Sequence, residues 1–593
     1  MPTDTIPARL LAHAAARPTA PALLTRRGDA WEAISYGEYG ALARQIARAL
    51  LALGLEPAGR ACILGANRAE WVLFDVGTML AGGVPAGIYE TCSAEEVGWI
   101  VAHAEAKVVL VEDHAQWEKV AACRASLPAL RAVVWMRGAP PVDDPLVLSW
   151  EAFLARGDAV DGAAVDARLE AAGPQDMATF IYTSGTTGPP KAVMLSHHNL
   201  TWTADAAIGI VSLGPNDRLL SYLPLSHIAE QMFSIHGPIT AGAPVYFARS
   251  RETLVDDMKS VQPTVFFGVP RVWEKVQARL ATRIAELKGP KARLFAWARG
   301  VGAAWTAGRA AGEVPGFALR AQYALANKLV FSKIKGLGGL GAVRVCVSGA
   351  APISAEVLRF LGEVDILVHE VYGQSEGSGP TSFNLPGRVR FGTVGQAVPG
   401  VEVRIAPDGE VLLRGPNVFL GYFKDLAATE ACLREGWLAS GDLGALDADG
   451  FLTITGRKKE ILITAGGKNI TPANIEAALK DIPLVGQAVV IGDRRRFLSA
   501  LLTLDPDAAA AFRASAGLDP QAPLHAHAEV QRVVQAGVDE VNRRFARVES
   551  VRRFTILPRE LSQEQGELTP TQKVKRRVVE ANWASAIDAM YAE

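Results

Sequence analysis

The segment Ala178–Leu200, ATFIYTSGTTGPPKAVMLSHHNL, places an apolar strand directly before a loop rich in glycine and hydroxyl residues. The loop reads Thr183-Ser184-Gly185-Thr186-Thr187-Gly188, and Lys191 follows shortly after it. Glycines let the backbone turn tightly and aim N–H groups at an anion, and hydroxyls add donors that can also reach a metal. A lysine adds a mobile positive charge. We therefore predict a phosphate-binding loop at Thr183–Lys191, with a surface turn as the alternative.

The spacing of this loop differs from that of the kinase and GTPase phosphate loop, G-x-x-x-x-G-K-[ST]. The fifth residue after Gly185 is Pro190, where that motif has glycine. A nucleotide site of the kinase type is therefore disfavoured.

Short apolar runs followed by glycine-rich turns and helical patterns recur on both sides of this loop. The runs predict buried strands at residues 60–64, 108–111, 179–182, 264–268, 343–348 and 366–372. Residues 38–56 carry apolar side chains at helical spacing. Buried strands that alternate with helices indicate doubly wound α/β layers, here as two subdomains.

The pattern changes after about residue 390, where apolar and polar residues alternate. Asp408-Gly409 and Asp449-Gly450 are hairpin signals within this part. Helical patterns return from Pro472 onward. We expect a β-rich subdomain that ends near Gly456, followed by a small α/β domain.

The composition narrows the classes of function. A chain of 593 residues is too long for one ordinary core, and 61 basic against 62 acidic residues leave a net charge of -1. That balance implies no electrostatic attraction to nucleic acid. The five cysteines are scattered without metal-type spacing, and the N-terminus lacks the pattern of a signal peptide. The expectation is a cytoplasmic protein.

Residues 283–336 read as two or three alanine-rich amphipathic helices with Lys and Arg on one side. One interpretation is a helical excursion packed on the main domain. The other is a peripheral contact with the inner face of a membrane.

Six further segments, together with the loop, decide the family. They are LPLSH at 223–227, SGAAP at 348–352, YGQSE at 372–376, SGD at 440–442, GRKKE at 456–460 and TPTQK at 569–573. In sequence and order they resemble the motifs of the adenylate-forming superfamily of acyl-CoA synthetases, luciferases and peptide-synthetase adenylation domains. The resemblance spans roughly residues 30–580.

The resemblance implies an enzyme that joins an acid to CoA with ATP as co-substrate and Mg²⁺ as cofactor. Glu376 and Thr186 would bind Mg²⁺, since carboxylate and hydroxyl oxygens suit that ion. Contacts to ATP or AMP are implied for Thr183, Ser184, Gly185, Thr186, Thr187, Gly188, Lys191, Gly349, Ala350, Ala351, Tyr372, Gly373, Gln374, Ser375, Asp442 and Arg457.

The chemistry explains why such residues are needed. A carboxylate must attack the already anionic α-phosphate of ATP, so the site has to neutralise charge and align the reactants. The resemblance assigns the catalytic cation to Lys573 and places His227 between the acyl and nucleotide sites. A solvated charge run and a structural histidine are the alternatives for these two residues.

The resemblance also implies a domain movement. It divides the chain into an N-terminal adenylation domain, 1–456, a hinge, 457–459, centred on Lys459, and a C-terminal domain, 460–593. One pose would present Lys573 for adenylation. The other would present the loop with Gly466, Gly467 and Lys468 for thioester formation with CoA.

Several details resemble the long-chain and very-long-chain fatty acid branch. They are Gln-Ser-Glu at 374–376, LPLSHIAEQ at 223–231, FFGVPRVWEK at 266–275 and NKLVFSKIKGLGG at 327–339. In that branch the segment Val269–Trp273 lines or gates an acyl tunnel, so Val269 and Trp273 are candidates for that role. A plain packing tryptophan is the alternative. Many relatives have glycine before the catalytic lysine, where this chain has Thr571-Gln572.

Three alternatives to a long-chain fatty acid–CoA ligase remain open at this point. They are a synthetase for a medium-chain or aromatic acid, an acyl-AMP ligase that serves a carrier protein, and a non-catalytic acyl- or nucleotide-binding relative. The joint presence of Lys191, Glu376, Asp442, Arg457 and Lys573 argues against the last. A homodimer is a further open expectation.

Overall fold

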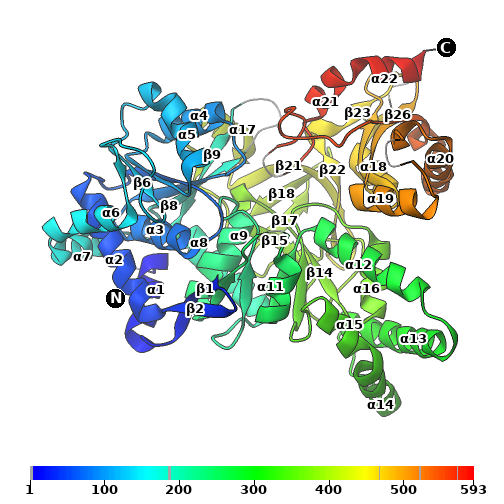
Figure 1. Ribbon diagram of the computed structural model, residues 1–593, viewed down its shortest axis with the longest axis horizontal. Helices are drawn as coiled ribbons and strands as arrows, with labels where there is room; N and C mark the ends of the chain where they lie inside the picture. Colours follow the sequence, from blue (N-terminus) through cyan, green and yellow to red (C-terminus); the bar gives the residue numbers. More distant parts are fainter. Residues whose placement is uncertain are drawn as a thin grey trace.

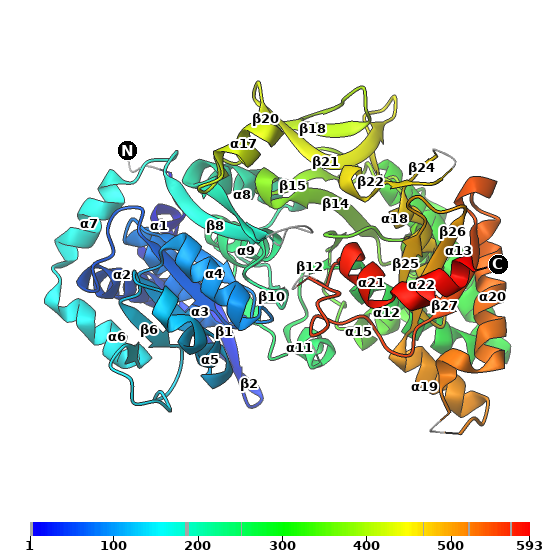
Figure 2. The ribbon, with the colours of Figure 1, turned by 90° about the horizontal axis from the view of Figure 1, so that it is seen from above.

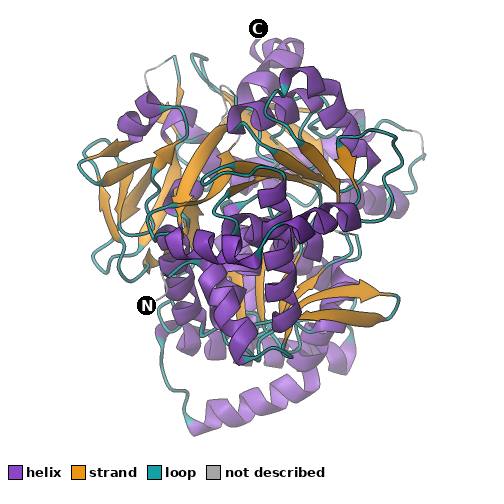
Figure 3. Cartoon of the chain, turned by 90° about the vertical axis from the view of Figure 1, so that its left-hand side faces the viewer, coloured by secondary structure: helices purple, strands orange, loops and turns teal. Residues whose placement is uncertain are grey.

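The computed structural model describes residues 4–183, 189–250, 252–465, 468–519, 522–569 and 572–592. It is an α/β protein in which a large N-terminal part is followed by a smaller C-terminal part (Figure 1). Helices and strands alternate in layers through the molecule (Figure 3). The predicted fold class is confirmed.

An eight-stranded sheet forms the first subdomain, in the order β19-β9-β8-β4-β3-β5-β6-β7. The strands from β8 to β7 along this order are parallel, whereas β9 pairs antiparallel with β8 and β19 pairs antiparallel with β9. The bounds are β3 Arg60–Leu64, β4 Val84–Ile88, β5 Val108–Val111, β6 Ala132–Trp135, β7 Val147–Leu148, β8 Met177–Thr183, β9 Lys191–Ser196 and β19 Gly421–Tyr422. Strands β3, β4 and β5 are buried except for Arg60, because helices cover both faces of a parallel sheet.

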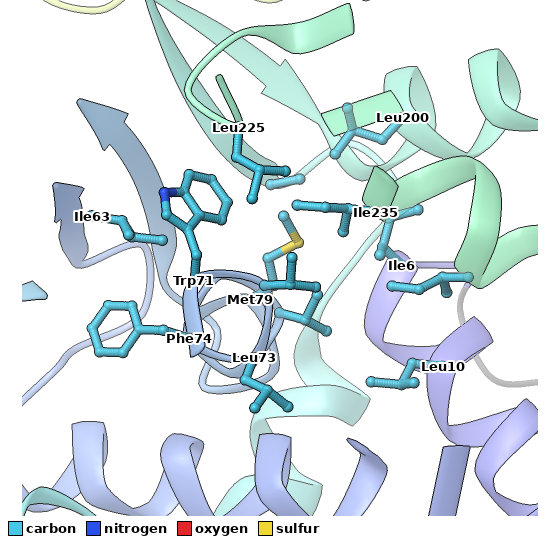
Figure 4. Packing of buried hydrophobic residues seen from close by; sticks show 14 of the residues in the cluster. Ile6, Leu10, Ile63, Trp71, Leu73, Phe74, Met79, Leu200, Leu225 and Ile235 are labelled. Carbon is cyan, nitrogen blue, oxygen red and sulfur yellow. The ribbon is translucent and has the colours of Figure 1, made fainter. Parts of the chain in front are cut away.

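The helices of this subdomain are α2 Tyr36–Ala52, α3 Ala69–Leu80, α4 Ala94–Ala104 and α5 His114–Cys123. Helices α2, α4 and α5 begin at side-chain caps, whereas α3 has no side-chain cap hydrogen bond. Ser35 and Glu38 form a capping box at the start of α2. Every residue of α3 except Glu70 is buried, and its Trp71, Phe74 and Met79 lie among side chains from β3 and from later helices (Figure 4).

The second subdomain has a five-stranded sheet in the order β12-β13-β14-β15-β16. The bounds are β12 Val265–Gly268, β13 Val345–Ser348, β14 Val368–Gln374, β15 Gly379–Phe383 and β16 Gln396–Ala397. A smaller sheet, β10-β11-β1-β2, comprises β10 Leu219–Ser221, β11 Val245–Phe247, β1 Pro21–Arg27 and β2 Ala30–Ser35. Strands β12, β13 and β14 are parallel, so their carboxyl ends lie at one edge of the sheet.

Both hairpin predictions are confirmed in the β-rich part. Strands β17 Glu402–Ile405 and β18 Glu410–Arg414 pair across Asp408-Gly409. Strands β21 Trp437–Leu446 and β22 Leu452–Arg457 pair across Asp449-Gly450.

The C-terminal part contains a three-stranded sheet, β25-β26-β27, with helices around it (Figure 2). The bounds are β25 Val485–Ile491, β26 Leu498–Leu504, β27 Val551–Ile556, α18 Pro472–Lys480, α19 Pro506–Ser515, α20 Ala528–Asn542, α21 Arg576–Asn582 and α22 Ala584–Tyr591. Its core is separate from the cores of the N-terminal part.

The predicted helical excursion is present and extends away from the sheets (Figure 1). It comprises α13 Gly289–Ala311, α14 Phe317–Ala326 and α15 Ser332–Leu337, and helix α12 Pro270–Ala285 precedes it. Phe317 and Val314 are 88% and 79% exposed. Within the described ranges, no helix combines the length and the apolar character needed to cross a membrane.

Candidate active site

One cavity of 2620 Å³ lies between the N-terminal subdomains and the C-terminal part. Its wall collects many residues that the sequence motifs had singled out from distant parts of the chain. They are Thr183, Lys191, His227, Val269, Trp273, Ala350, Ala351, Tyr372, Gly373, Gln374, Ser375, Glu376, Asp442, Arg457, Lys459 and Lys573.

Some predicted site residues fall elsewhere. Ser184, Gly185, Thr186, Thr187, Gly188, Gly466 and Gly467 lie outside the described residues. Gly349 and Lys468 are described but do not line the cavity. The backbone N–H of Lys468 donates to Thr464 Oγ1 in a small hairpin, β23 Leu462–Ile463 and β24 Asn469–Ile470.

Asp442 is at the centre of a three-residue cluster on the cavity wall. It pairs in register with Arg457 across β21 and β22, which brings Arg457 Nε to 2.8 Å from Asp442 Oδ1. The Tyr372 hydroxyl donates to Asp442 Oδ2 at 2.7 Å. Burial and the nearby Asp442 charge raise the pKa of Tyr372 well above its usual range, so this hydroxyl remains a donor. Both carboxylate oxygens are therefore oriented before any ligand binds.

Gly373 follows Tyr372 because no side chain would fit there. A Cβ at this position would lie 1.7 Å from the Gly379 carbonyl oxygen, where β14 and β15 approach each other. Ala350 lies on the same side of the cavity with a φ of 71°, a left-handed conformation that is costly for a residue with a Cβ.

Glu376 follows the end of β14 and is half-buried. The Tyr422 hydroxyl donates to Glu376 Oε1 at 2.7 Å. No hydrogen bond to Glu376 Oε2 is found among the described residues, so this oxygen could bind a hard cation. No sequence motif indicated Tyr422. Its contact with Glu376 depends on the pairing of β19 with β9, which comes from a distant part of the chain.

Lys191 already has a partner in this structure. Its Nζ lies 3.0 Å from Asp425 Oδ2 and 5.0 Å from the centroid of the Tyr422 ring. A phosphate contact from Lys191 would therefore compete with Asp425, which also caps helix α17 Leu426–Cys432.

His227 caps helix α9 Ile228–Gln231, and its Nδ1 accepts from the Ala229 N–H at 3.1 Å. In the neutral imidazole the proton must then be on Nε2, which becomes a donor. Burial and the charge of Lys573 lower the pKa of His227 to about 4. His227 is thus a neutral hydrogen-bond donor at neutral pH.

A buried polar network behind His227 was not predicted from the sequence. Glu230 Oε1 accepts from Ser221 Oγ at 2.7 Å and from Ser234 Oγ at 2.6 Å. Asn67 Nδ2 donates to the Leu223 carbonyl at 2.5 Å, and Asn67 Oδ1 accepts from the Leu225 N–H at 3.1 Å. These bonds fix the loop that carries His227 from its buried side.

Lys573 lies in a tight loop closed by two bonds to Thr569. Its N–H donates to Thr569 Oγ1 at 3.0 Å, and its carbonyl accepts from the Thr569 N–H at 2.8 Å. The side chain is open to the cavity. Desolvation by the surrounding protein and the positive charge of Arg457 lower the pKa of Lys573. The negative charges of Asp442 and Glu376 act in the opposite direction. These charges surround the ammonium group.

The backbone explains one departure from the family pattern. Gln572 has a φ of 62°, a left-handed conformation that favours glycine. A glycine at this position, as the family pattern has it, would adopt this conformation without steric strain, whereas Gln572 adopts it with strain.

Part of the cavity wall is apolar and includes Ile210, Val211, Leu213, Met232, Phe233 and Phe267. Trp273 is 0% exposed, and its indole N–H lies 3.1 Å from the Gly268 carbonyl and 3.2 Å from the Val347 carbonyl. These bonds favour the packing alternative over a swinging gate, because a gate would have to break both.

The comparisons with known proteins give the class. Residues 10–423 match the family described as AMP-binding enzyme, and residues 459–593 match the AMP-binding enzyme C-terminal domain. The chain belongs to the AMP-binding enzyme family, which confirms the resemblance drawn from the motifs.

Two similar proteins are named as long-chain-fatty-acid–CoA ligases. The chain is 38% identical over 605 residues to long-chain-fatty-acid–CoA ligase ACSBG2 of Xenopus laevis, covering 96% of this chain and 82% of that protein. It is 39% identical over 569 residues to long-chain-fatty-acid–CoA ligase FadD15 of Mycobacterium bovis, covering 95% and 92%.

Solved structures share the fold. The A domain of carboxylic acid reductase from Segniliparus rugosus, in complex with AMP and a co-purified carboxylic acid, has a TM-score of 0.76 at 20% identity, covering 99% of this chain and 94% of that one. The anthranilate CoA ligase AuaEII in complex with anthranoyl-AMP has a TM-score of 0.74 at 21% identity, covering 99% and 98%.

Proposed function

We propose that this protein is an AMP-forming long-chain fatty acid–CoA ligase. One observation carries the proposal: Tyr372, Glu376, Asp442, Arg457 and Lys573 line a single cavity whose wall also carries apolar side chains. The relatives at 38–39% identity, named as long-chain-fatty-acid–CoA ligases, support the choice of acid and of CoA.

In the first half-reaction a carboxylate oxygen of the fatty acid attacks the α-phosphorus of ATP. A bond forms between this oxygen and the α-phosphorus. The bond from the α-phosphorus to the oxygen that bridges to the β-phosphorus breaks, and pyrophosphate leaves. Lys573 supplies a positive charge where negative charge accumulates, and His227 Nε2–H can donate to the attacking carboxylate. Tyr372 would stack on adenine, and the carboxylate of Asp442 would accept from the ribose hydroxyls.

The residues present fit a magnesium ion that arrives with ATP. Among the described residues no group of three or more His, Cys, Asp or Glu side chains could bind a metal alone. Glu376 would therefore be one ligand, with phosphate oxygens and water as the others. When bound, the ion neutralises phosphate charge.

In the second half-reaction the sulfur of CoA attacks the acyl carbon. The C–S bond forms, the bond from the acyl carbon to the AMP oxygen breaks, and the thiol proton passes to solvent. We assign this step to a second pose of the C-terminal domain, reached by rotation around Lys459, in which the loop with Gly466, Gly467 and Lys468 faces the site.

The apolar part of the cavity wall supports a long acyl chain. Each buried CH₂ contributes about 0.8 kcal/mol of transfer free energy, so a longer chain binds more tightly until the pocket is filled. Val269 and Trp273 would form part of the wall of this pocket.

A coupled pyrophosphate assay across acids of increasing length tests the proposal. We expect release that requires both ATP and acid and is most efficient with long chains. A preference for a medium-chain or aromatic acid would correct the substrate. If a folded sample releases no pyrophosphate with any acid, the assignment of the protein as an enzyme is contradicted.

A peripheral membrane contact is a second part of the proposal. It is supported by exposed apolar residues next to basic ones, such as Phe317 beside Arg320 on α14 and Leu329 beside Lys328. We expect sedimentation with anionic vesicles, and less sedimentation for Phe317→Ser. Equal sedimentation of the two proteins would contradict it. The homodimer remains a prediction for light scattering to test.

A further inference from the structure

Helix α12 has different neighbours on its two sides. Trp273 is buried in the core and lines the cavity. Arg271 and Lys275 are exposed, one helical turn apart, and both extend toward the C-terminal domain. The helix thus joins the wall of the cavity to the surface on which the other domain rests.

The C-terminal side of this contact is acidic. Asp505 Oδ2 pairs with Arg271 Nη2, and Asp507 Oδ2 lies 3.9 Å from Lys275 Nζ. We call Arg271, Lys275, Asp505 and Asp507 the α12 contact. A third interdomain ion pair joins Arg544 of the C-terminal domain to Glu356 at 3.3 Å. Glu356 belongs to helix α16 Ala355–Glu363 of the N-terminal domain.

Asp505 is held in place within its own domain. It follows the end of β26, its N–H donates to the Leu484 carbonyl at 3.0 Å, and its Oδ1 accepts from the Ala508 N–H at 3.0 Å as the cap of α19. The side chains of Arg271 and Asp505 are 45% and 17% exposed. A fixed carboxylate loses little entropy when it pairs with the cation, which favours this pair over an ordinary surface ion pair.

The α12 contact coexists with Lys573 at the cavity. Arg271 belongs to the N-terminal domain, whereas Asp505 and Lys573 both belong to the C-terminal domain. A rotation around Lys459 that withdraws Lys573 would also separate Asp505 from Arg271.

We propose that Arg271, assisted by Lys275, is a positioning residue that stabilises the pose presenting Lys573, and so serves adenylation but not thioester formation. The inference rests on the proposed two-step function. It assigns to α12 a second task besides forming part of the cavity wall.

The test compares Arg271→Gln with Arg293→Gln. Arg293 is exposed on the next helix, α13, and does not line the cavity, and no ion pair of its side chain is found in the described part of the chain. Two rates are measured: acyl-AMP formation without CoA, and acyl-CoA formation from supplied acyl-AMP. We expect Arg271→Gln to slow the first about two- to fivefold, the range for a partly exposed ion pair, and to leave the second unchanged or faster. Arg293→Gln should change neither rate.

Two further variants separate positioning from simple damage. Arg271→Lys keeps the charge and should recover part of the first rate. Asp505→Asn keeps a good helix cap but loses the charge, so it should match Arg271→Gln, and the double variant should be no slower than either. Added salt should slow acyl-AMP formation by the wild-type protein more than by Arg271→Gln.

An unchanged rate of acyl-AMP formation in Arg271→Gln, or an equal loss in both rates, would overturn the inference. Absence of pyrophosphate release from the wild-type protein with every acid would instead overturn the proposed function, and the inference with it.

Discussion

At the residue scale, the site depends on side chains oriented by other side chains. Tyr422 illustrates this, because its hydroxyl is a donor to the carboxylate that we assign to magnesium. Tyr372 has the same relation to Asp442. Hydrogen bonds to a charged group typically contribute about 1.5–3 kcal/mol.

Tyr422→Phe should therefore weaken the use of Mg·ATP. We expect the KM for Mg·ATP to rise roughly 10-fold or more, as the loss of a charge-assisted bond implies. Tyr323→Phe is the matched control, since its hydroxyl donates to Asp365 Oδ2 at 2.8 Å away from the cavity. If both variants behave like wild type, the link between Tyr422 and the metal ligand is wrong.

Glu230 should make the stability of the protein depend on pH. Burial raises its pKa from 4.5 to about 8, although bonds from Ser234 and Ser221 act in the opposite direction. A carboxyl with a raised pKa in the folded state contributes stability below pH 4.5 and loses it as pH rises through 8.

Glu230→Gln removes this titration and keeps the shape. From pH 5 to pH 9 the wild-type protein should lose a few kcal/mol of unfolding free energy relative to Glu230→Gln. Denaturant midpoints of both proteins at the two pH values measure the difference. A constant difference would show that Glu230 keeps an ordinary pKa.

At the element scale, strands and hairpins were predictable from local patterns, whereas contacts between distant elements were not. The runs at 60–64 and 108–111 are strands β3 and β5, with the predicted bounds. Asp408-Gly409 and Asp449-Gly450 are turns because a local pair of residues decides the turn type. The antiparallel addition of β19 to the large sheet depends on packing over more than 200 residues of intervening chain, which no local pattern reveals.

The candidate site divides in the same way. Motifs located Tyr372, Asp442 and Lys573, because the family resemblance covers those short segments. Asn67 and Glu230 were missed because their importance depends on the buried loop they contact. A lone asparagine gives no signal of that kind in sequence.

Asn67→Ala should loosen the His227 loop. It removes bonds to Leu223, Leu225 and Ser221, and we expect a loss of about 1–3 kcal/mol of unfolding free energy together with a lower kcat. Thermal unfolding and single-turnover rates measure the two effects. A stability loss with unchanged kcat would show that the loop keeps His227 in place without Asn67.

Trp273→Ala distinguishes a wall from a gate. A fixed wall predicts a loss of about 3–5 kcal/mol of unfolding free energy, because a large buried side chain leaves a cavity. A mobile gate predicts faster acyl entry with little loss of stability. Denaturant unfolding and the pyrophosphate assay across acids of increasing length together distinguish the wall from the gate. Trp273→Phe is the milder control.

At the scale of the whole molecule, the two domains enclose one cavity, and the lysine we assign to catalysis comes from the smaller domain. The C-terminal part contacts helix α12 of the N-terminal part through the ion pair of Asp505 with Arg271. As part of the proposed function, we assign this arrangement to the adenylation pose. Thioester formation would then require the smaller domain to move.

The most direct test of the account is a single-turnover reaction with ATP and a long-chain acid, quenched and analysed for acyl-AMP and acyl-CoA. The account predicts that acyl-AMP accumulates on the enzyme without CoA and is converted to acyl-CoA and AMP when CoA is added. Lys573→Ala should slow acyl-AMP formation about 10²–10³-fold and still convert supplied acyl-AMP to acyl-CoA. Acyl-CoA formation without an adenylate intermediate, or equal loss of both steps in Lys573→Ala, would contradict the account.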